Sequence, residues 1–189
     1  MHIGLYFGSF NPVHTGHLII ANYVSNNVDV DQVWLIVSPQ NPLKPSKSLL
    51  NEYHRLHLVQ LATEDDPKIK ASDVEFKLPK PSYTITTLSF LQEKYPSYKF
   101  SVVMGADSFQ NIHNWKNSDI LLRDHHFLIY NRHGFEIPVK RHNINTLDAP
   151  LLGISATEIR QLIKQKKSIR YMVPEKVRLE IEANNYYGL

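Results

Sequence analysis

The stretch IGLYFGSFNPVHTGH, residues 3–17, decides the fold, because it leads from an apolar strand through a polar turn into a helix. Its first five residues form a compact apolar run, typical of a strand that is covered on both faces. Pro12 cannot continue a strand ladder, and it disfavours helical backbone at the residue before it. The chain therefore turns after Gly8, and a helix is predicted to begin near His14 or Thr15.

The same rhythm of short apolar runs and amphipathic stretches continues along the chain. Further strands are predicted at 32–38, 70–76, 99–104 and 126–130, and helices at 15–26, 52–64, 84–94, 156–166 and 174–184, with a broken helical segment at 109–122. This alternation is typical of an α/β protein with a doubly wound parallel sheet. The weakest pattern, at 134–150, is interpreted as a loop with a short extra strand at 143–147. We expect a single domain over 1–189, with 151–189 as a small C-terminal helical subdomain.

Composition excludes several classes of protein. None of the 189 residues is cysteine, which excludes a disulfide scaffold, a thiolate zinc site and a cysteine nucleophile. A hydrophobic content of 42% is enough for a core, and the net charge of +3 suits phosphate ligands but is too small to indicate duplex DNA. The sequence shows no signal peptide and no apolar run near the ~20 residues of a membrane span. We therefore expect a cytoplasmic protein without membrane or nucleic-acid partners.

Two histidines at the start of the first predicted helix form the sharpest candidate site. Being three residues apart, His14 and His17 share a helix face. The helix N-terminus offers N–H groups and a positive dipole end to a phosphate, and Gly16 leaves room for a close ligand. A structural turn with two solvated histidines, or the start of a zinc site, would also explain a bare H-x-x-H pair. The position at a strand end favours the anion site.

A second candidate anion site lies near the other end of the chain, in I-S-A-T-E-I-R, residues 154–160. Ser155 and Glu158 have the spacing of a capping box, which is a purely structural role. That cap does not require Thr157 or Arg160, and an arginine is a forked donor well suited to phosphate.

Three segments between these two motifs carry further candidate ligands. The segment P-S-Y-T enters a helix, where capping by Ser82 or Thr84 is the plainest explanation. Asp107 follows Gly105 just past a predicted strand, where it could accept from ribose hydroxyls or cap a helix. An isolated Trp115 is more typical of a core or an interface than of a ligand platform.

Together these motifs resemble a known family. G-S-F-N-P-V-H-T-G-H resembles the signature of the nucleotidyltransferase superfamily that includes class I aminoacyl-tRNA synthetases, in which the H-x-G-H histidines hold the phosphates of ATP. With I-S-A-T-E-I-R, P-S-Y-T-I-T-T-L, G-A-D and the following tryptophan, the chain is similar to the bacterial nicotinate mononucleotide adenylyltransferases. The resemblance implies a Rossmann-like fold and a transfer of AMP from ATP to nicotinate mononucleotide, which forms deamido-NAD and pyrophosphate in NAD biosynthesis.

The resemblance also implies a role for each motif. The catalytic residues, which neutralise the reacting phosphates, would be His14, His17, Lys44 and Arg160. The residues that bind ATP would be Gly8, Ser9, Phe10, Gly16, Gly105, Asp107, Arg132, Ile154, Ser155 and Thr157. The acceptor, with its cationic ring and its carboxylate, would be bound by Ser82, Tyr83, Thr84 and Trp115. Mg²⁺ would be bound mainly through the phosphates of ATP rather than by a protein site.

Two positions depart from the family pattern. Leu43 stands where the family usually has a histidine, so we expect the missing phosphate donor to be Lys47 or Arg55. Lys116 follows Trp115 at a position that is often aromatic in the family.

Other functions use related motifs. They include adenylyl or cytidylyl transfer to nicotinamide mononucleotide, phosphopantetheine, FMN or a polyol phosphate, a non-catalytic nucleotide sensor, and an RNA-binding fragment related to the synthetases. The presence of His14, His17 and Arg160 argues against a sensor, and the modest charge argues against RNA. The sequence leaves open whether the chain forms a homo-oligomer.

Overall fold

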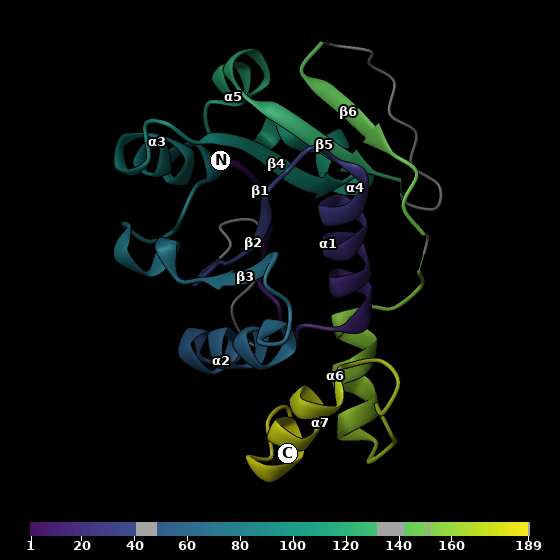
Figure 1. Cartoon of the computed structure of the whole chain (residues 1–189). Helices are drawn as coiled ribbons and strands as arrows, with labels where there is room; N and C mark the ends of the chain where they lie inside the picture. Colours follow the sequence, from purple (N-terminus) through teal and green to yellow (C-terminus); the bar gives the residue numbers. More distant parts are fainter. Residues whose placement is uncertain (41–48, 132–141, 151, 189) are drawn as a thin grey trace.

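The computed structural model describes residues 1–40, 49–131, 142–150 and 152–188, which form a six-stranded parallel sheet with helices on both faces (Figure 1). The order of the strands across the sheet is β3-β2-β1-β4-β5-β6. This is the predicted doubly wound arrangement, in which ligands bind beyond the carboxyl ends of the strands where the strand order reverses, here between β1 and β4. The strands are β1 (His2–Gly8), β2 (Gln32–Val37), β3 (Ile69–Ser72), β4 (Lys99–Gly105), β5 (His126–Tyr130) and β6 (Ile144–Leu147).

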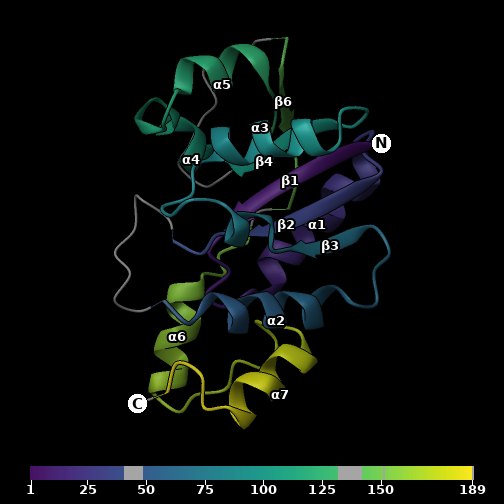
Figure 2. The same ribbon diagram turned by 90° about the vertical axis from the view of Figure 1, so that its left-hand side faces the viewer.

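Two hydrophobic clusters, one on each face, hold the helices to the sheet. The first cluster contains residues of α1 (Thr15–Asn27), α2 (Glu52–Thr63), α6 (Ala156–Lys164) and α7 (Glu175–Ala183). The second contains residues of η1 (Val74–Lys77), α3 (Thr84–Lys94), α4 (Ala106–Gln110), η2 (Ile112–Asn114) and α5 (Ser118–Asp124). Figure 2 shows the two layers, with α2 and α7 on one side of the sheet and α3 and α5 on the other.

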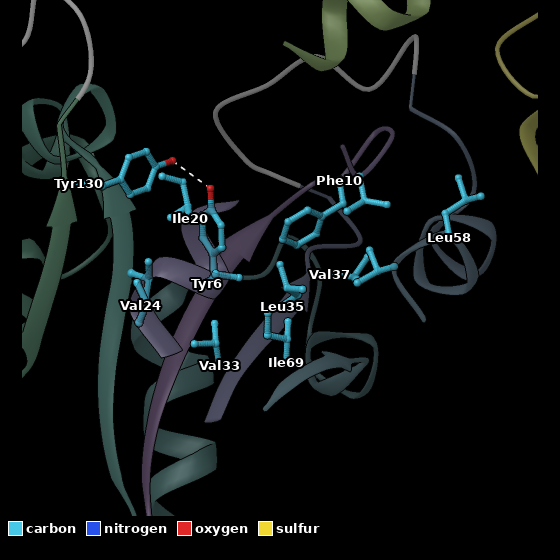
Figure 3. Close-up of a cluster of buried hydrophobic side chains, with 14 of the residues drawn as sticks. Tyr6, Phe10, Ile20, Val24, Val33, Leu35, Val37, Leu58, Ile69 and Tyr130 are labelled. Carbon is cyan, nitrogen blue, oxygen red and sulfur yellow. Dashed lines mark hydrogen bonds between the residues drawn. The ribbon is translucent and has the colours of Figure 1, made fainter. Parts of the chain in front are cut away.

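The strands are almost continuously apolar because helices cover both faces of the sheet. Successive side chains of a strand point to opposite faces, so Leu5 enters the second cluster and Tyr6 the first. In the parallel register, Tyr6 lies beside Leu35 of β2 and Val103 of β4, and all three belong to the same cluster. Figure 3 shows this cluster, in which the hydroxyls of Tyr6 and Tyr130 lie 3.0 Å apart.

Most predicted elements agree with the structure to within two residues, but two differ. The strand predicted over 70–76 ends at Ser72, and Val74–Lys77 forms a 3-10 helix instead. Val74 is buried against the helical layer, so its apolar character reflects packing and not strand pairing. The broken helical segment begins at Ala106 rather than at 109, and the left-handed backbone of Asn117 (φ 53°) separates its last helix from the rest.

The C-terminal helix α7 lies beyond α2, and α6 begins beside α2 (Figure 2). Val177 and Ile181 of α7 are buried in the first cluster, and the N–H of Thr15, at the start of α1, donates to the carbonyl of Met172 (2.9 Å). The C-terminal segment is thus anchored to the first helix, while its separation as a subdomain stays a prediction. None of the helices in the described ranges is long and apolar enough to cross a membrane.

Candidate active site

The turn between β1 and α1 is built around the buried ring of Phe10. Its backbone is left-handed (φ 44°), which is unusual for a residue with a side chain. The ring is 2% exposed and packs edge-on against His17, with ring centroids 4.9 Å apart. A Cβ on Gly8 would lie 2.8 Å from this ring, so the glycine allows Phe10 to fold back over the end of β1. Burial of the ring offsets the backbone strain, which is on the order of 1–3 kcal/mol.

The structure brings the rings of His14 and His17 together. They stack with centroids 3.7 Å apart, and the backbone N–H of His14 donates to Nδ1 of His17 (3.2 Å). Since Nδ1 accepts this bond, neutral His17 carries its proton on Nε2, where it can donate to a phosphate oxygen. A Cβ on Gly16 would lie 3.0 Å from Nδ1 of His14. The room that Gly16 was expected to leave for a ligand is therefore occupied by the His14 ring.

Arg160 connects the two motifs that lie far apart in the sequence. Its Nη1 donates to the backbone carbonyl of Asn11 (2.7 Å), and its Nη2 donates to Oγ1 of Thr157 (3.3 Å). Ile154 also reaches this place, since its Cβ would lie 3.8 Å from a Cβ on Gly16. The start of α6 thus faces the loop after β1.

Ser155 caps α6, accepting from the N–H of Glu158 (3.2 Å). Its hydroxyl hydrogen can still be donated to a ligand, because a hydroxyl both donates and accepts. The predicted cap and the predicted role in phosphate binding are therefore compatible at this residue.

The expectation that Arg55 donates to phosphate is wrong, because its guanidinium is enclosed by backbone carbonyls. The side chain is fully buried and donates from Nε to the carbonyl of Leu50 (2.7 Å) and from Nη1 to those of Ser9 (2.6 Å) and Ser38 (2.8 Å). Its Nη2 donates to the carbonyl of Pro39 (3.0 Å), and burial lowers the pKa of Arg55. Arg55 thereby holds the loop after β1, the end of β2 and the start of α2 together. No signal in the sequence distinguishes it from a solvated arginine on an amphipathic helix.

Residues 82–87 contain three of the predicted acceptor ligands and are called the acceptor segment. Glu75, a residue that the sequence patterns do not single out, binds this segment from the protein interior. The hydroxyl of Ser82 donates to Oε2 of Glu75 (2.6 Å), and that of Thr87 donates to Oε1 (2.9 Å). Ser82 is 7% exposed, so its hydroxyl binds Glu75 in the protein interior, whereas the family pattern predicted that it binds the acceptor substrate. The residue that caps α3 is Tyr83, through its backbone, and neither Ser82 nor Thr84 does so.

Asp107 lies in the first turn of α4, and the N-cap residue of this helix is Gly105. A Cβ on Gly105 would collide with the Asp107 carboxylate and lie 3.2 Å from the ring of Tyr130. The glycine thus lets the carboxylate fold back over the end of β4, where a ribose could be bound.

Trp115 and the segment that holds Tyr83 lie close together. Both aromatic residues are partly buried against the second cluster, and Nζ of Lys116 lies 4.5 Å from the centroid of the Tyr83 ring. Three of the residues predicted from the family pattern, Lys44, Lys47 and Arg132, lie outside the described residues. Within the described ranges no group of three or more His, Asp or Glu side chains could hold a metal ion.

The parallel sheet, the stacked histidines after β1 and the arginine of α6 are the features of a nucleotidyltransferase-type fold, and residues 5–162 match the cytidylyltransferase-like family. The chain is 50% identical to a probable nicotinate-nucleotide adenylyltransferase of Flavobacterium psychrophilum, with 99% of each chain covered. A protein of Cytophaga hutchinsonii with the same name is 47% identical, covering 100% of this chain and 99% of that one. The chain belongs to the nicotinate-nucleotide adenylyltransferase family.

A solved structure has the same fold. It is that of Plasmodium falciparum nicotinic acid mononucleotide adenylyltransferase complexed with NaAD, with a TM-score of 0.85 and 23% sequence identity. The match covers 98% of this chain and 97% of that chain, so it extends to the C-terminal helices as well as the sheet.

Proposed function

We propose that this protein transfers the adenylyl group of ATP to nicotinate mononucleotide in the cytoplasm, forming deamido-NAD and pyrophosphate. The observation that carries the proposal is the bond from Arg160 to the carbonyl of Asn11, which brings α6 to the loop beside the stacked His14 and His17 rings. These groups lie past the end of β1, where the order of strands reverses and where open parallel sheets bind nucleotides. Relatives of the chain that are 47–50% identical over its length carry the name of this activity.

The proposed reaction requires alignment and charge neutralisation rather than acid–base chemistry. An oxygen of the acceptor phosphate, already an anion at neutral pH, attacks the α-phosphorus of ATP while the bond from that phosphorus to the bridging oxygen of the pyrophosphate breaks. Nε2–H of His17 and the Arg160 guanidinium would stabilise negative charge on the transferring and leaving phosphates. Ser155 and Thr157 would donate from the start of α6, and Asp107 would accept from the ribose hydroxyls of ATP. Mg²⁺, entering with ATP, would supply further positive charge to the leaving pyrophosphate.

The acceptor would bind between the start of α3 and Trp115. The first N–H groups of a helix favour an anion, and those of Tyr83 and Thr84 would receive the carboxylate of the nicotinate ring. The cationic pyridinium would lie against the Trp115 face. A carboxamide would present an NH₂ donor to the same N–H groups and leave them unmatched, so the acid is expected to be preferred over the amide.

The proposed function is tested by incubating the protein with Mg-ATP and each of several acceptors while pyrophosphate release is measured. Nicotinate mononucleotide is expected to give the fastest release, and the dinucleotide product is identified by mass spectrometry. Faster release with nicotinamide mononucleotide, phosphopantetheine or FMN would point to another member of the superfamily. No release with any acceptor would favour a nucleotide sensor.

Replacing Lys116 by glutamine is expected to lower the preference for the acid about fivefold. The ammonium group lies 4.5 Å from the centroid of the Tyr83 ring, whose residue belongs to the segment proposed to bind the carboxylate. It would attract the acid, and it would repel the amide, whose ring has a positive charge without a compensating carboxylate. The measurement is the ratio of kcat/KM for nicotinate mononucleotide to that for nicotinamide mononucleotide.

The matched control for this variant is Lys94→Gln. Nζ of Lys94 lies 5.3 Å from the centroid of the Tyr95 ring at the other end of α3, so the two lysines make the same kind of contact. An equal change in the acid-to-amide ratio for both variants, or no change for Lys116→Gln, would contradict the proposed role of Lys116.

A further inference from the structure

Glu75 is a buried acid whose described partners are hydroxyl groups. It belongs to the short helix η1, its side chain is 2% exposed, and no ion pair to it occurs among the residues that the structure describes. Its carboxylate receives hydrogen bonds from the hydroxyls of Ser82 and Thr87. Burying a charge without a counter-charge is costly, so a role in packing alone would be better served by an apolar side chain.

The two hydroxyls come from places that matter for the proposed acceptor site. Ser82 and Thr87 lie on either side of Tyr83 and Thr84. The bonds from Ser82 and Thr87 are 2.6 and 2.9 Å long, within the range of hydrogen bonds to an ionised acceptor. The carboxylate therefore ties both flanks of the acceptor segment to the short helix η1.

An ionised carboxylate suits this task because it only accepts hydrogen bonds. Each of the two hydroxyls must turn its hydrogen toward Glu75, which leaves a single arrangement of donors around it. A neutral amide of the same shape has one accepting oxygen and one donating NH₂ group, so at least one hydroxyl has to turn around. The charge thus specifies the arrangement of the segment more strictly than a neutral residue would.

We propose that Glu75 is a positioning residue, which holds residues 82–87 so that the N–H groups of Tyr83 and Thr84 face the carboxylate of the acceptor. The inference rests on the proposed function, because that function supplies the acceptor. Glu75 itself would touch neither substrate, because it acts through Ser82 and Thr87.

The test is the variant Glu75→Gln, assayed with both substrates. We expect the KM for nicotinate mononucleotide to rise about tenfold, as for the loss of one well-placed hydrogen bond. The KM for ATP should change less than about twofold, because the ATP phosphates would contact other segments. Thr87→Val, which keeps the shape of the side chain and removes one donor, is expected to change the same KM in the same direction.

The unfolding temperatures of variants distinguish a positioning role of Glu75 from a merely structural one. Burial raises the pKa of Glu75 above that in the unfolded chain, so keeping this side chain ionised lowers the stability of the folded protein at neutral pH. Glutamine removes that cost, and Glu75→Gln is therefore expected to fold and to unfold at a temperature near that of the wild type. The control is Leu91→Ala, which removes a buried contact of α3 from the core and lowers stability while leaving the ratio of the two KM values unchanged.

Hydrogen exchange of the backbone N–H groups of residues 82–87 gives a second readout that does not depend on activity. It should be faster in Glu75→Gln than in the wild type, and unchanged in the sheet. An unchanged acceptor KM, an equal rise of both KM values, or unchanged exchange at 82–87 would overturn the proposal. A wild-type protein that releases no pyrophosphate with nicotinate mononucleotide would instead overturn the proposed function, whatever the exchange experiment shows.

Discussion

Replacing His17 by alanine is expected to lower kcat by about 10²–10³-fold, which is the usual loss when one preorganised donor to a transition state is removed. Nδ1 of His17 accepts from the backbone N–H of His14, so Nε2–H is the donor that the reacting phosphates would lose. The stability should fall much less, because the imidazole is only half-buried and a net hydrogen bond contributes about 1 kcal/mol. The measurements are pyrophosphate release at saturating substrates and unfolding in urea.

The control for this variant is His126→Ala. His126 is an exposed histidine at the first residue of β5, the end of the strand away from the candidate site. Its removal should change neither kcat nor stability appreciably. Normal turnover in His17→Ala would refute the assignment of the site, and a parallel loss of activity and stability would indicate a role in folding alone.

Replacing Arg55 by methionine is expected to lower the free energy of unfolding by about 3–5 kcal/mol. Methionine fills part of the same volume but removes the donor from four carbonyl oxygens in buried or partly buried hydrogen bonds, those of Ser9, Ser38, Pro39 and Leu50. Because a domain of this size is stabilised by only about 5–15 kcal/mol, the variant should be marginally stable at 25 °C. Urea unfolding followed by circular dichroism measures the change.

Arg178→Met is the matched control. Arg178 forms ion pairs with Glu175 (2.7 Å) and Glu182 (2.6 Å) on α7, more charged contacts than Arg55 makes. Ion pairs at the surface are screened by water, so this variant should unfold close to the wild type. Similar losses in the two variants would show that the carbonyl contacts of Arg55 contribute little.

The succession of elements follows from the sequence itself. The helix predicted over 84–94 and the strand over 126–130 have the predicted bounds in the structure. The strong local signals are the apolar strand runs, which helices bury on both faces of the sheet, and Pro12, which lies in the turn after the first strand. The strand of the weak stretch, predicted over 143–147, is found at Ile144–Leu147. Where these local signals compete with packing, as at Val74, the pattern predicts a strand that the structure does not have.

The approximate place of the site could also be predicted from the sequence. Parallel strands carry their carboxyl ends to one edge of the sheet, so the motifs after β1 and β4 had to lie near each other. The spacing of His14 and His17 was enough to predict that they share a helix face, and their rings stack. The bond from Arg160 to Asn11 spans 149 residues, and no local pattern predicts it.

The sequence by itself therefore determined the order of strands and helices along the chain. It also determined which residue types lie at one edge of the sheet. Only the tertiary structure decided which charged residues support that edge from within. Arg55 and Glu75 look like solvated residues in the sequence, because burial depends on contacts with segments far along the chain. Their partners are backbone carbonyls in one case and hydroxyls in the other, groups that occur throughout any sequence and become specific only when folding brings them together.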